Sequence, residues 1–328
     1  MLPKFAKLIE FKRNDLVEQE HQGIILHISK NTILNKVGED NNYKFYQRSC
    51  MKPLQLALHV DLGLHDLYRF SSEEMAVGAA SHCGDLDHQR VVRSILKKID
   101  LDETFLLCPP QTPLSKSEQD RLLLENLNYK AVHNNCSGKH SMMLALCKYK
   151  GWSIENYLDD AHPLNFEIIN KILELCEVAS NDYVRSKDGC GLSTVATTLM
   201  QLGKGFLNLF TEEKYSCIKD AFLKNPYLIG GRERLDSEII AASSDLLAKV
   251  GAAGLCVVVN LKKEEAIVVK IADANMKARS LVTIEALRQL GWLNDSQIDS
   301  NPINKLFDKS ITTLQGEELG EAEFCFNL

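Results

Sequence analysis

Two apolar runs in the C-terminal part of the chain constrain its fold most strongly. Residues 254–259 and 266–271 are rich in β-branched side chains, and the polar residues 260–265 separate them. This pattern is typical of two strands joined by a turn. Near the N-terminus, residues 24–28 and 31–37 predict two more short strands. We therefore expect a sheet with strands from both ends of the chain.

The middle of the chain has a helical pattern. From about residue 71 to 240, apolar residues recur at spacings of three and four. Ser71 and Glu74 have the spacing of a capping box at the start of the first helix. Further helices are expected over residues 86–99, 115–127, 137–149, 165–178, 194–202, 211–223, 236–247 and 279–290.

These patterns predict an α/β fold with layered helices and strands. A helical lobe, about residues 66–247, is inserted into a sheet lobe made of about residues 1–65 and 248–328. We find no repeat and no interdomain linker, so residues 1–328 are expected to form a single unit.

Composition narrows the class of partner. The net charge is −6 and no dense run of Lys or Arg occurs, which argues against nucleic acid as a partner. No apolar run reaches the roughly 18 residues that span a membrane, and the first residues lack the apolar core of a signal peptide. The ten cysteines therefore indicate a reducing cytoplasm. A small-molecule substrate is expected.

A serine and a lysine three positions apart suggest catalysis. In Arg48-Ser49-Cys50-Met51-Lys52, a helix beginning at or just before Ser49 puts the Lys52 amine on the same face as the Ser49 hydroxyl. Serine becomes a useful nucleophile when a base takes its proton. Lysine can be that base where burial or a second cation, here Arg48, lowers its pKa. The alternative is a solvated helix face.

Two polar clusters lie in the helical part. Ser81 comes at the end of an apolar helix, where its hydroxyl has the alternative of bonding its own backbone. Residues 133–140, His-Asn-Asn-Cys-Ser-Gly-Lys-His, directly precede another apolar run. The backbone N–H groups of such a helix start favour an anion, for example a substrate carboxylate. Because a structural cap needs only one polar side chain, the second cluster favours a binding function.

Two further features involve a thiol and an amine. Cys190 lies between two glycines and, with Cys136, has the ligand type that Zn²⁺ accepts. The spacing matches no zinc finger, so two buried structural thiols are the alternative.

Lys270 lies in an apolar strand, where an ammonium needs a partner or loses its proton. The alternative is an edge-strand lysine that points to solvent.

Taken in this order, the clusters resemble one family. They are Arg-Ser-x-x-Lys-Pro, Ala-Ser-His, His-Asn-Asn-Cys-Ser-Gly-Lys-His, His162-Pro163, Asp-Gly-Cys-Gly and Gly-x-x-Arg-x-Asp. Together they resemble the thermolabile, rhizobial type of L-asparaginase, the asparaginase II family, from about Gly23 to beyond Lys270. The resemblance implies a fold similar to serine β-lactamases and serine-dependent glutaminases, a homodimer, and hydrolysis of L-asparagine to L-aspartate and ammonia.

The resemblance also implies roles for particular residues. Two Ser–Lys pairs, Ser49 with Lys52 and Ser81 with Lys270, would be catalytic, and a zinc ion would tune substrate affinity without being essential. Arg48 is expected to bind the substrate carboxylate and Asp188 its ammonium group. The expected site thus comprises catalytic Ser49, Lys52, Ser81 and Lys270, substrate-binding Arg48, Asp188 and His140, and zinc-binding Cys136, Lys139 and Cys190.

The sequence departs from the family pattern at a few positions. Ser193 stands where the family often has proline, and Ala253 stands where it has a glutamate. Cys83 and Asp85 replace the usual serine and glutamate. The lost carboxylate at residue 253 leaves substrate detail and metal affinity open.

The expected reaction is amide hydrolysis through an acyl-enzyme, with Ser49 as the nucleophile and backbone N–H groups stabilising the oxyanion. Ser81 with Lys270 as the attacking pair is the alternative. A glutaminase or another small amidase, and an amino-acid-binding protein without turnover, are the alternative functions.

Overall fold

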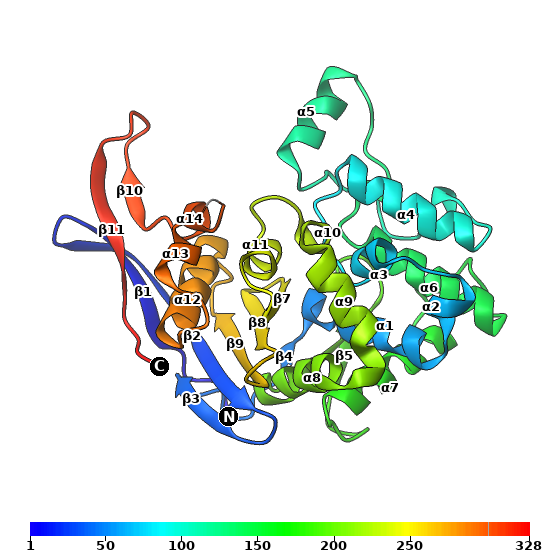
Figure 1. The fold of residues 1–328 in the computed structure, drawn as a ribbon, viewed down its shortest axis with the longest axis horizontal. Coiled ribbons are helices and arrows are strands. Elements are labelled where there is room, and N and C mark those ends of the chain that lie inside the picture. Colours follow the sequence, from blue (N-terminus) through cyan, green and yellow to red (C-terminus); the bar gives the residue numbers. More distant parts are fainter. Residues whose placement is uncertain (301) are drawn as a thin grey trace.

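The computed structural model describes residues 1–300 and 302–328. Within them, eight strands form a large antiparallel sheet in the order β10-β11-β1-β2-β9-β8-β7, with β3 paired to β2 (Figure 1). The strands come from both chain ends, so the predicted fold class is confirmed. They are β1 (Ala6–Arg13), β2 (Leu16–Ser29), β3 (Ile33–Val37), β7 (Leu246–Gly251), β8 (Leu255–Asn260), β9 (Glu265–Ile271), β10 (Ser310–Thr312) and β11 (Glu318–Phe324).

Most helices come between β3 and β7 in the sequence. They lie at the centre and right of Figure 1, beside the large sheet. Among the described residues, none of them combines the length and apolar character needed to cross a membrane. They are α1 (Lys52–Asp61), α2 (Leu64–Leu67), α3 (Ser72–Gly78), α4 (Leu86–Lys98), α5 (Lys116–Leu124), α6 (Ser137–Lys150), α7 (Pro163–Leu175), α8 (Leu199–Thr211), α9 (Ser216–Lys224), α10 (Pro226–Gly230) and α11 (Leu235–Ala242), followed after the C-terminal strands by α12 (Met276–Gln289), α13 (Asp295–Ile298) and α14 (Ile303–Leu306).

The centre of the large sheet is covered on both faces. Val268 of β9 packs towards Gly203 of α8, whereas Cys256 of β8 lies against Thr283 of α12. Cys256 and Val257 point to opposite faces, and Val257 is the register partner of Val268. The two helices therefore cover opposite faces. This explains why β8 and β9 are continuous apolar runs rather than alternating ones.

Local signals placed several elements correctly. Ser71 caps α3 and forms the predicted capping box with Glu74. The hairpin of β8 and β9 is present, and α6 ends at Gly151, which adopts φ +67°. Left-handed backbone of this kind is the usual conformation of a glycine that terminates a helix.

Two predicted helices are wrong in part. Residues 194–202 begin as a strand, β6 (Ser193–Thr197), and the helix α8 starts only at Leu199. Thr194, Val195 and Thr197 are β-branched, and Thr198 then caps α8. Residues 236–247 likewise divide into α11 and β7, because Ser243 is extended. Strand β6 pairs with β4 (Phe45–Tyr46) and β5 (Val184–Lys187) in a small second sheet.

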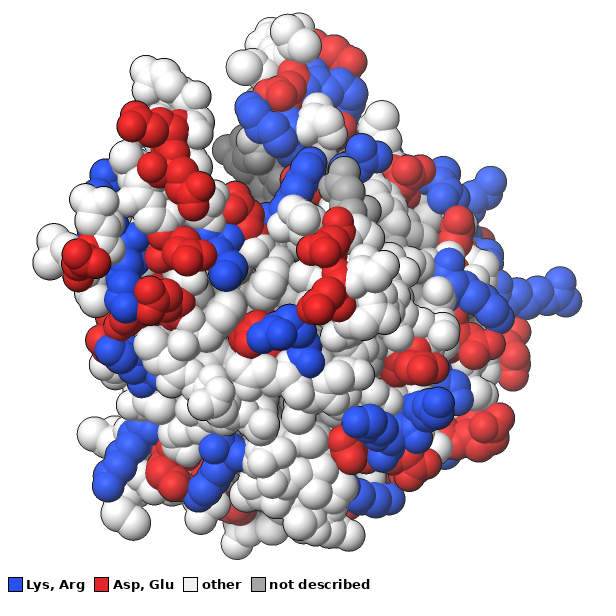
Figure 2. Space-filling view, turned by 60° about the vertical axis from the view of Figure 1, so that its left-hand side comes forward, with Lys and Arg blue, Asp and Glu red and all other residues white. Residues whose placement is uncertain are grey.

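The surface carries charges of both signs. In Figure 2, Lys and Arg side chains are interspersed with Asp and Glu, and neither sign dominates the face shown. Formal charge over the whole chain is −6.

Candidate active site

One cavity gathers several of the polar clusters. Its volume is about 310 Å³, and five segments far apart in the chain border it. It is lined by Arg48, Ser49, Pro109, Pro110, Gln111, Asn134, Asn135, Cys136, Asp188, Gly189, Cys190 and Ala252.

Ser49 lies in a short 3-10 turn, η1 (Arg48–Met51), directly before α1, so the predicted helix start is close to the observed one. The turn is held on both sides of the serine. The buried Gln47 side chain donates to Thr197 Oγ1 at 2.9 Å. The Cys50 thiol donates to the Lys249 carbonyl at 3.4 Å. Ser49 thus lines the cavity from a fixed backbone, as an attacking hydroxyl requires.

Lys52 is the first residue of α1, directly after this turn, and it is fully buried. Its amine donates to the carbonyls of Ala80 at 2.7 Å and Asn135 at 3.1 Å, and to Ser81 Oγ at 3.1 Å. Burial lowers the pKa of Lys52, and this favours the neutral amine that a general base needs. Within the described residues Lys52 forms no hydrogen bond with Ser49, and the hydroxyl that it contacts is that of Ser81.

Ser81 is also buried, but it does not line the cavity. It follows the end of α3 at Gly78 by three residues, and its backbone N–H donates to the Ile229 carbonyl at 3.0 Å. Ser81 is therefore held outside α3. The Lys52 amine lies between its hydroxyl and the start of α6.

Lys270, which we expected to pair with Ser81, makes its hydrogen bonds elsewhere. It lies in β9, inside the sheet, and its amine donates to the carbonyls of Ala253 at 2.6 Å and Ile271 at 2.7 Å. It also lies 5.9 Å from the centre of the Phe45 ring. Among the described residues it has no hydrogen bond to Ser81. The edge-strand alternative is wrong, because β9 lies between β2 and β8 and Lys270 is buried. Burial lowers its pKa.

The three predicted zinc ligands lie together. Lys139 Nζ is 3.0 Å from Cys190 Sγ, and Cys136, whose thiol donates to Asn135 Oδ1 at 3.2 Å, lies close enough to Cys190 to affect its titration. Both cysteines line the cavity, whereas Lys139 is fully buried behind them. Two thiol sulfurs and an amine nitrogen that converge in this way are donors that suit Zn²⁺.

The charges within this group depend on one another. The neighbouring Cys136 and the Lys139 ammonium lower the pKa of the Cys190 thiol, against the effect of burial. Burial alone would lower the pKa of Lys139, but the Cys190 thiolate holds it above its ordinary value. The pKa of Cys136 is raised by the neighbouring Cys190 and by burial. A metal at this position must therefore displace protons from Cys136 and Lys139.

His140, which we expected to bind substrate, does not line the cavity. It is fully buried in α6, and its Nδ1 is 2.8 Å from the Tyr157 hydroxyl. Burial lowers its pKa, and Cys190 opposes this effect. His140 therefore lies in the protein interior and does not face the cavity.

Arg48 and Asp188 form an ion pair at the cavity wall. Arg48 Nε donates to Asp188 Oδ1 at 2.6 Å, and both residues line the cavity. Arg48 has φ +51°, a backbone conformation that non-glycine residues adopt infrequently, so the position of its side chain depends on a specific turn. The expected carboxylate-binding and ammonium-binding groups are thus neighbours and neutralise each other.

Three lining residues, Pro109, Pro110 and Gln111, did not attract notice in the sequence. They belong to an irregular segment between α4 and α5, and only the Pro-Pro pair signals a fixed loop there.

A buried ion pair was also missed. Lys249 Nζ is 2.9 Å from Asp236 Oδ2, and neither side chain is exposed. This pair lies beneath η1, because the Lys249 carbonyl accepts from Cys50.

Two solved structures are similar to the chain at low identity. A β-lactamase from Mycobacterium bovis shares 14% identity over 81% of this chain and 93% of that chain, with a TM-score of 0.44. A provisionally assigned β-lactamase from Bacteroides dorei DSM 17855 shares 12% identity over 76% of this chain and 84% of that chain, with a TM-score of 0.36. No curated protein matches the chain.

A protein-family model gives a direct assignment. The model described as L-asparaginase II matches residues 9–324, which include all the residues that line the cavity. A match of this extent covers both the sheet and the inserted helices. It supports an amidohydrolase of the asparaginase type, and the chain belongs to the L-asparaginase II family.

Proposed function

We propose that this protein is an L-asparaginase that works as a homodimer and hydrolyses L-asparagine to L-aspartate and ammonia by Ser–Lys catalysis. The observation that carries the proposal is the cavity itself. It brings together Ser49 and the Arg48–Asp188 pair, and the buried Lys52 amine donates to the carbonyl of Asn135, which also lines the cavity.

The Arg48–Asp188 pair suits a zwitterionic amino acid. A free amino acid brings one carboxylate and one ammonium, so it can exchange the internal ion pair for two pairs with the substrate. The Arg48 guanidinium would bind the α-carboxylate and Asp188 the α-ammonium. Asp188 is 6% exposed at the side chain and Arg48 33%, so the exchange requires movement mainly of Arg48.

Ser49 is the nucleophile that we favour, because it lines the cavity and Ser81 does not. Lys52, as a neutral amine, would take the proton from the attacking hydroxyl. The Ser81 hydroxyl, 3.1 Å from the Lys52 nitrogen, would keep the amine oriented. Lys270 would act only through the turn after β7, because its amine donates to the Ala253 carbonyl.

The start of α6 also favours negative charge near the reaction. Asn135 and Cys136 line the cavity immediately before this 14-residue helix. Backbone N–H groups at a helix start attract anions. They would stabilise either the substrate carboxylate or the negative charge that develops on the amide oxygen.

Cys136, Lys139 and Cys190 would hold the zinc ion of this proposal. When bound, zinc supplies a positive charge that can polarise or orient a substrate. Cys136 and Cys190 line the cavity wall, and the neighbouring Cys136 and Lys139 lower the pKa of the Cys190 thiol. We propose that zinc tunes affinity for asparagine and is not essential for turnover.

The decisive experiment is a comparison of substrates and serine variants. Ammonia release is measured from asparagine and glutamine, and hydrolysis is measured with a penicillin. The expected result is strong preference for asparagine and loss of ammonia release in Ser49→Ala with unchanged circular dichroism. Near-normal turnover of Ser49→Ala would refute the nucleophile, and mass spectrometry of the trapped acyl-enzyme would then be expected to locate the acyl group on Ser81.

A further inference from the structure

A second group of metal-binding side chains lies outside this cavity, at the start of α4. Cys83, Asp85 and His88 each offer one ligand atom, and these atoms all lie within 4.8 Å of one another. Cys83 and His88 are buried, and Asp85 is half-buried. None of the three has a role in the proposed hydrolysis.

We propose that Cys83, Asp85 and His88 form a binding site for a transition-metal ion of the Zn²⁺ type, separate from the Cys136–Lys139–Cys190 group. A thiolate, a carboxylate and an imidazole are ligands that zinc accepts, and three protein ligands leave one tetrahedral position open. The thiolate and the carboxylate balance the two charges of the ion.

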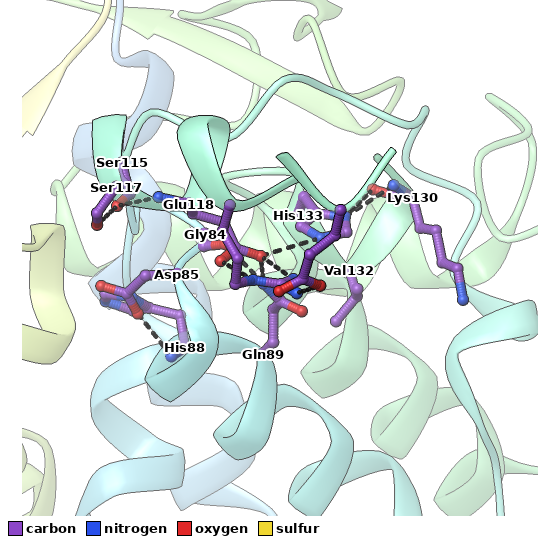
Figure 3. A network of polar contacts seen from close by, with 12 residues as sticks. Gly84, Asp85, His88, Gln89, Ser115, Ser117, Glu118, Lys130, Val132 and His133 are labelled. Carbon is purple, nitrogen blue, oxygen red and sulfur yellow. Dashed lines mark hydrogen bonds and ion pairs between the residues drawn. The ribbon is translucent and has the colours of Figure 1, made fainter. Parts of the chain in front are cut away.

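The separations of the ligand atoms fit such an ion. Zinc bonds of about 2.0–2.3 Å in a tetrahedron place ligand atoms about 3.3–3.8 Å apart. Cys83 Sγ is 3.7 Å from His88 Nδ1 and 3.3 Å from Asp85 Oδ2. Asp85 Oδ1 and His88 Nδ1 are closer, at 2.6 Å, because they share a proton in a hydrogen bond (Figure 3). Metal binding would replace that proton and increase the distance between these two atoms by less than about 1 Å.

The loop that carries the ligands is held in place by neighbouring groups. Gln89 Nε2 donates to the Gly84 carbonyl at 3.0 Å and to Glu118 Oε1 at 2.8 Å (Figure 3). The Cys83 carbonyl accepts from the Ser115 backbone N–H at 2.9 Å. Asp85 also caps α4 by accepting from the His88 N–H at 3.1 Å. A preorganised loop binds a metal without a large ordering cost.

Small ligands can reach the site. Cys83 and Asp85 line a cavity of about 580 Å³, together with Tyr227, Arg232 and Arg234 among others. Within the described part of the chain, Arg234 Nε is buried and has no hydrogen-bond partner. The N–H of this Nε atom needs an acceptor. A water molecule or a small anion, such as a carboxylate, could accept from it and also fill the fourth position of the metal.

The test uses the full chain with the first group of ligands removed. In Cys136→Ser/Cys190→Ser, titration with Co²⁺ is followed by thiolate-to-metal charge-transfer absorption, and Zn²⁺ is followed by its competition with Co²⁺. We expect one Co²⁺ per chain with a thiolate signal. Adding Cys83→Ser should remove the signal and weaken Zn²⁺ binding at least tenfold, whereas the control Cys217→Ser should change neither.

A second variant keeps the proposal testable if Cys83→Ser alters folding. Asp85→Asn retains an acceptor for the cap of α4 but offers a weaker metal ligand. It should weaken Zn²⁺ binding at least tenfold while the thiolate signal persists at saturation. Absence of a thiolate–Co²⁺ signal in the Cys136→Ser/Cys190→Ser protein, or equal Zn²⁺ affinity with and without Cys83, would overturn the proposal. Neither readout depends on asparaginase activity, so failure here is distinct from failure of the proposed function.

Discussion

Lys52 Nζ lies 3.1 Å from Ser81 Oγ, although the two residues are 29 positions apart in the sequence. The contact joins the start of α1 to the segment after α3. It makes Lys52 the amine shared by both parts of the site, since Ser49 belongs to the turn directly before it. Lys52 is therefore the position at which a single substitution tests the proposed proton transfer.

We predict that Lys52→Met lowers kcat for ammonia release by about 10²–10⁴-fold, because the general base is lost. The apolar side chain fills most of the same space. It leaves the carbonyls of Ala80 and Asn135 without this donor, which should cost about 1–3 kcal/mol of unfolding free energy. Steady-state kinetics and urea unfolding measure the two effects. A kcat within threefold of that of the unmodified protein would contradict the role of Lys52.

Substitutions at the Arg48–Asp188 pair should act mainly on substrate binding. Asp188→Asn is expected to raise KM at least tenfold, because the amide cannot pair with an ammonium group. Arg48→Lys retains the charge but loses the planar guanidinium, so a smaller increase is expected. A matched control is Arg90→Lys, since Arg90 lies on the exposed part of α4. An unchanged KM in Asp188→Asn would exclude this binding role.

Removal of one proposed zinc ligand should separate affinity from rate. Cys190→Ser is expected to lose bound zinc and to raise KM for asparagine by a larger factor than it lowers kcat. Metal content by mass spectrometry and kinetics with and without added Zn²⁺ measure this. Cys147→Ser is the control, because Cys147 is a buried thiol in the core cluster. Complete loss of kcat with an intact fold would show instead that the metal is essential.

The Lys249–Asp236 pair offers a stability test. Lys249→Met leaves a buried carboxylate without its partner and should cost about 3–5 kcal/mol. Adding Asp236→Asn removes the charge but keeps an acceptor for the Val250 N–H, which Asp236 now binds at 3.2 Å. The double variant should recover at least about 2 kcal/mol of this loss. If the double variant is no more stable than Lys249→Met, the ion pair is not the origin of the effect.

Stability should fall in mildly acidic solution. Burial lowers the pKa of His59, His82, His133 and His140 in the folded protein, whereas each titrates near 6.5 when unfolded. Below about pH 6.5 the unfolded chain therefore binds more protons, and each histidine costs up to about 1.4 kcal/mol per pH unit. This contribution is fully present above pH 6.5 and is lost as the pH falls. Urea unfolding between pH 7.5 and 5.5 measures the slope.

A histidine variant provides the control for that slope. His59→Gln should reduce it by about one quarter if the four residues contribute equally. His59 Nε2 is 2.8 Å from the Met142 carbonyl, and the Gln amide can donate in its place. Carboxylates titrate mainly below about pH 4.5 and lie outside this range. A flat profile from pH 7.5 to 5.5 would contradict the prediction.

Local patterns were sufficient for much of the fold. The capping box of Ser71 and the β-branched runs at 255–259 and 266–271 are encoded by neighbouring residues. The predicted helix over 194–202 failed because the strand β6 is stabilised by pairing with β4 and β5, which no local pattern reveals. Strands β1 and β11 escaped notice for the same reason, because they pair with each other from opposite ends of the chain.

For the site, the sequence indicated which residues would gather but not how they would pair. Arg48, Ser49, Asp188, Cys136 and Cys190 do line one cavity. The partner of a buried amine, however, depends on the packing of distant segments. Lys270 satisfies its donors with carbonyls of the turn after β7, while Lys52 reaches the hydroxyl that the motif order had associated with Lys270.

The first and last strands of the chain are adjacent in the large sheet, since β1 pairs with β11 along residues 9–13 and 320–324. A nascent chain therefore exposes one edge of β1 until residues 320–324 have left the ribosome. Contacts of such large sequence separation form slowly. Variants that weaken β11 would be expected to aggregate during synthesis more readily than after folding.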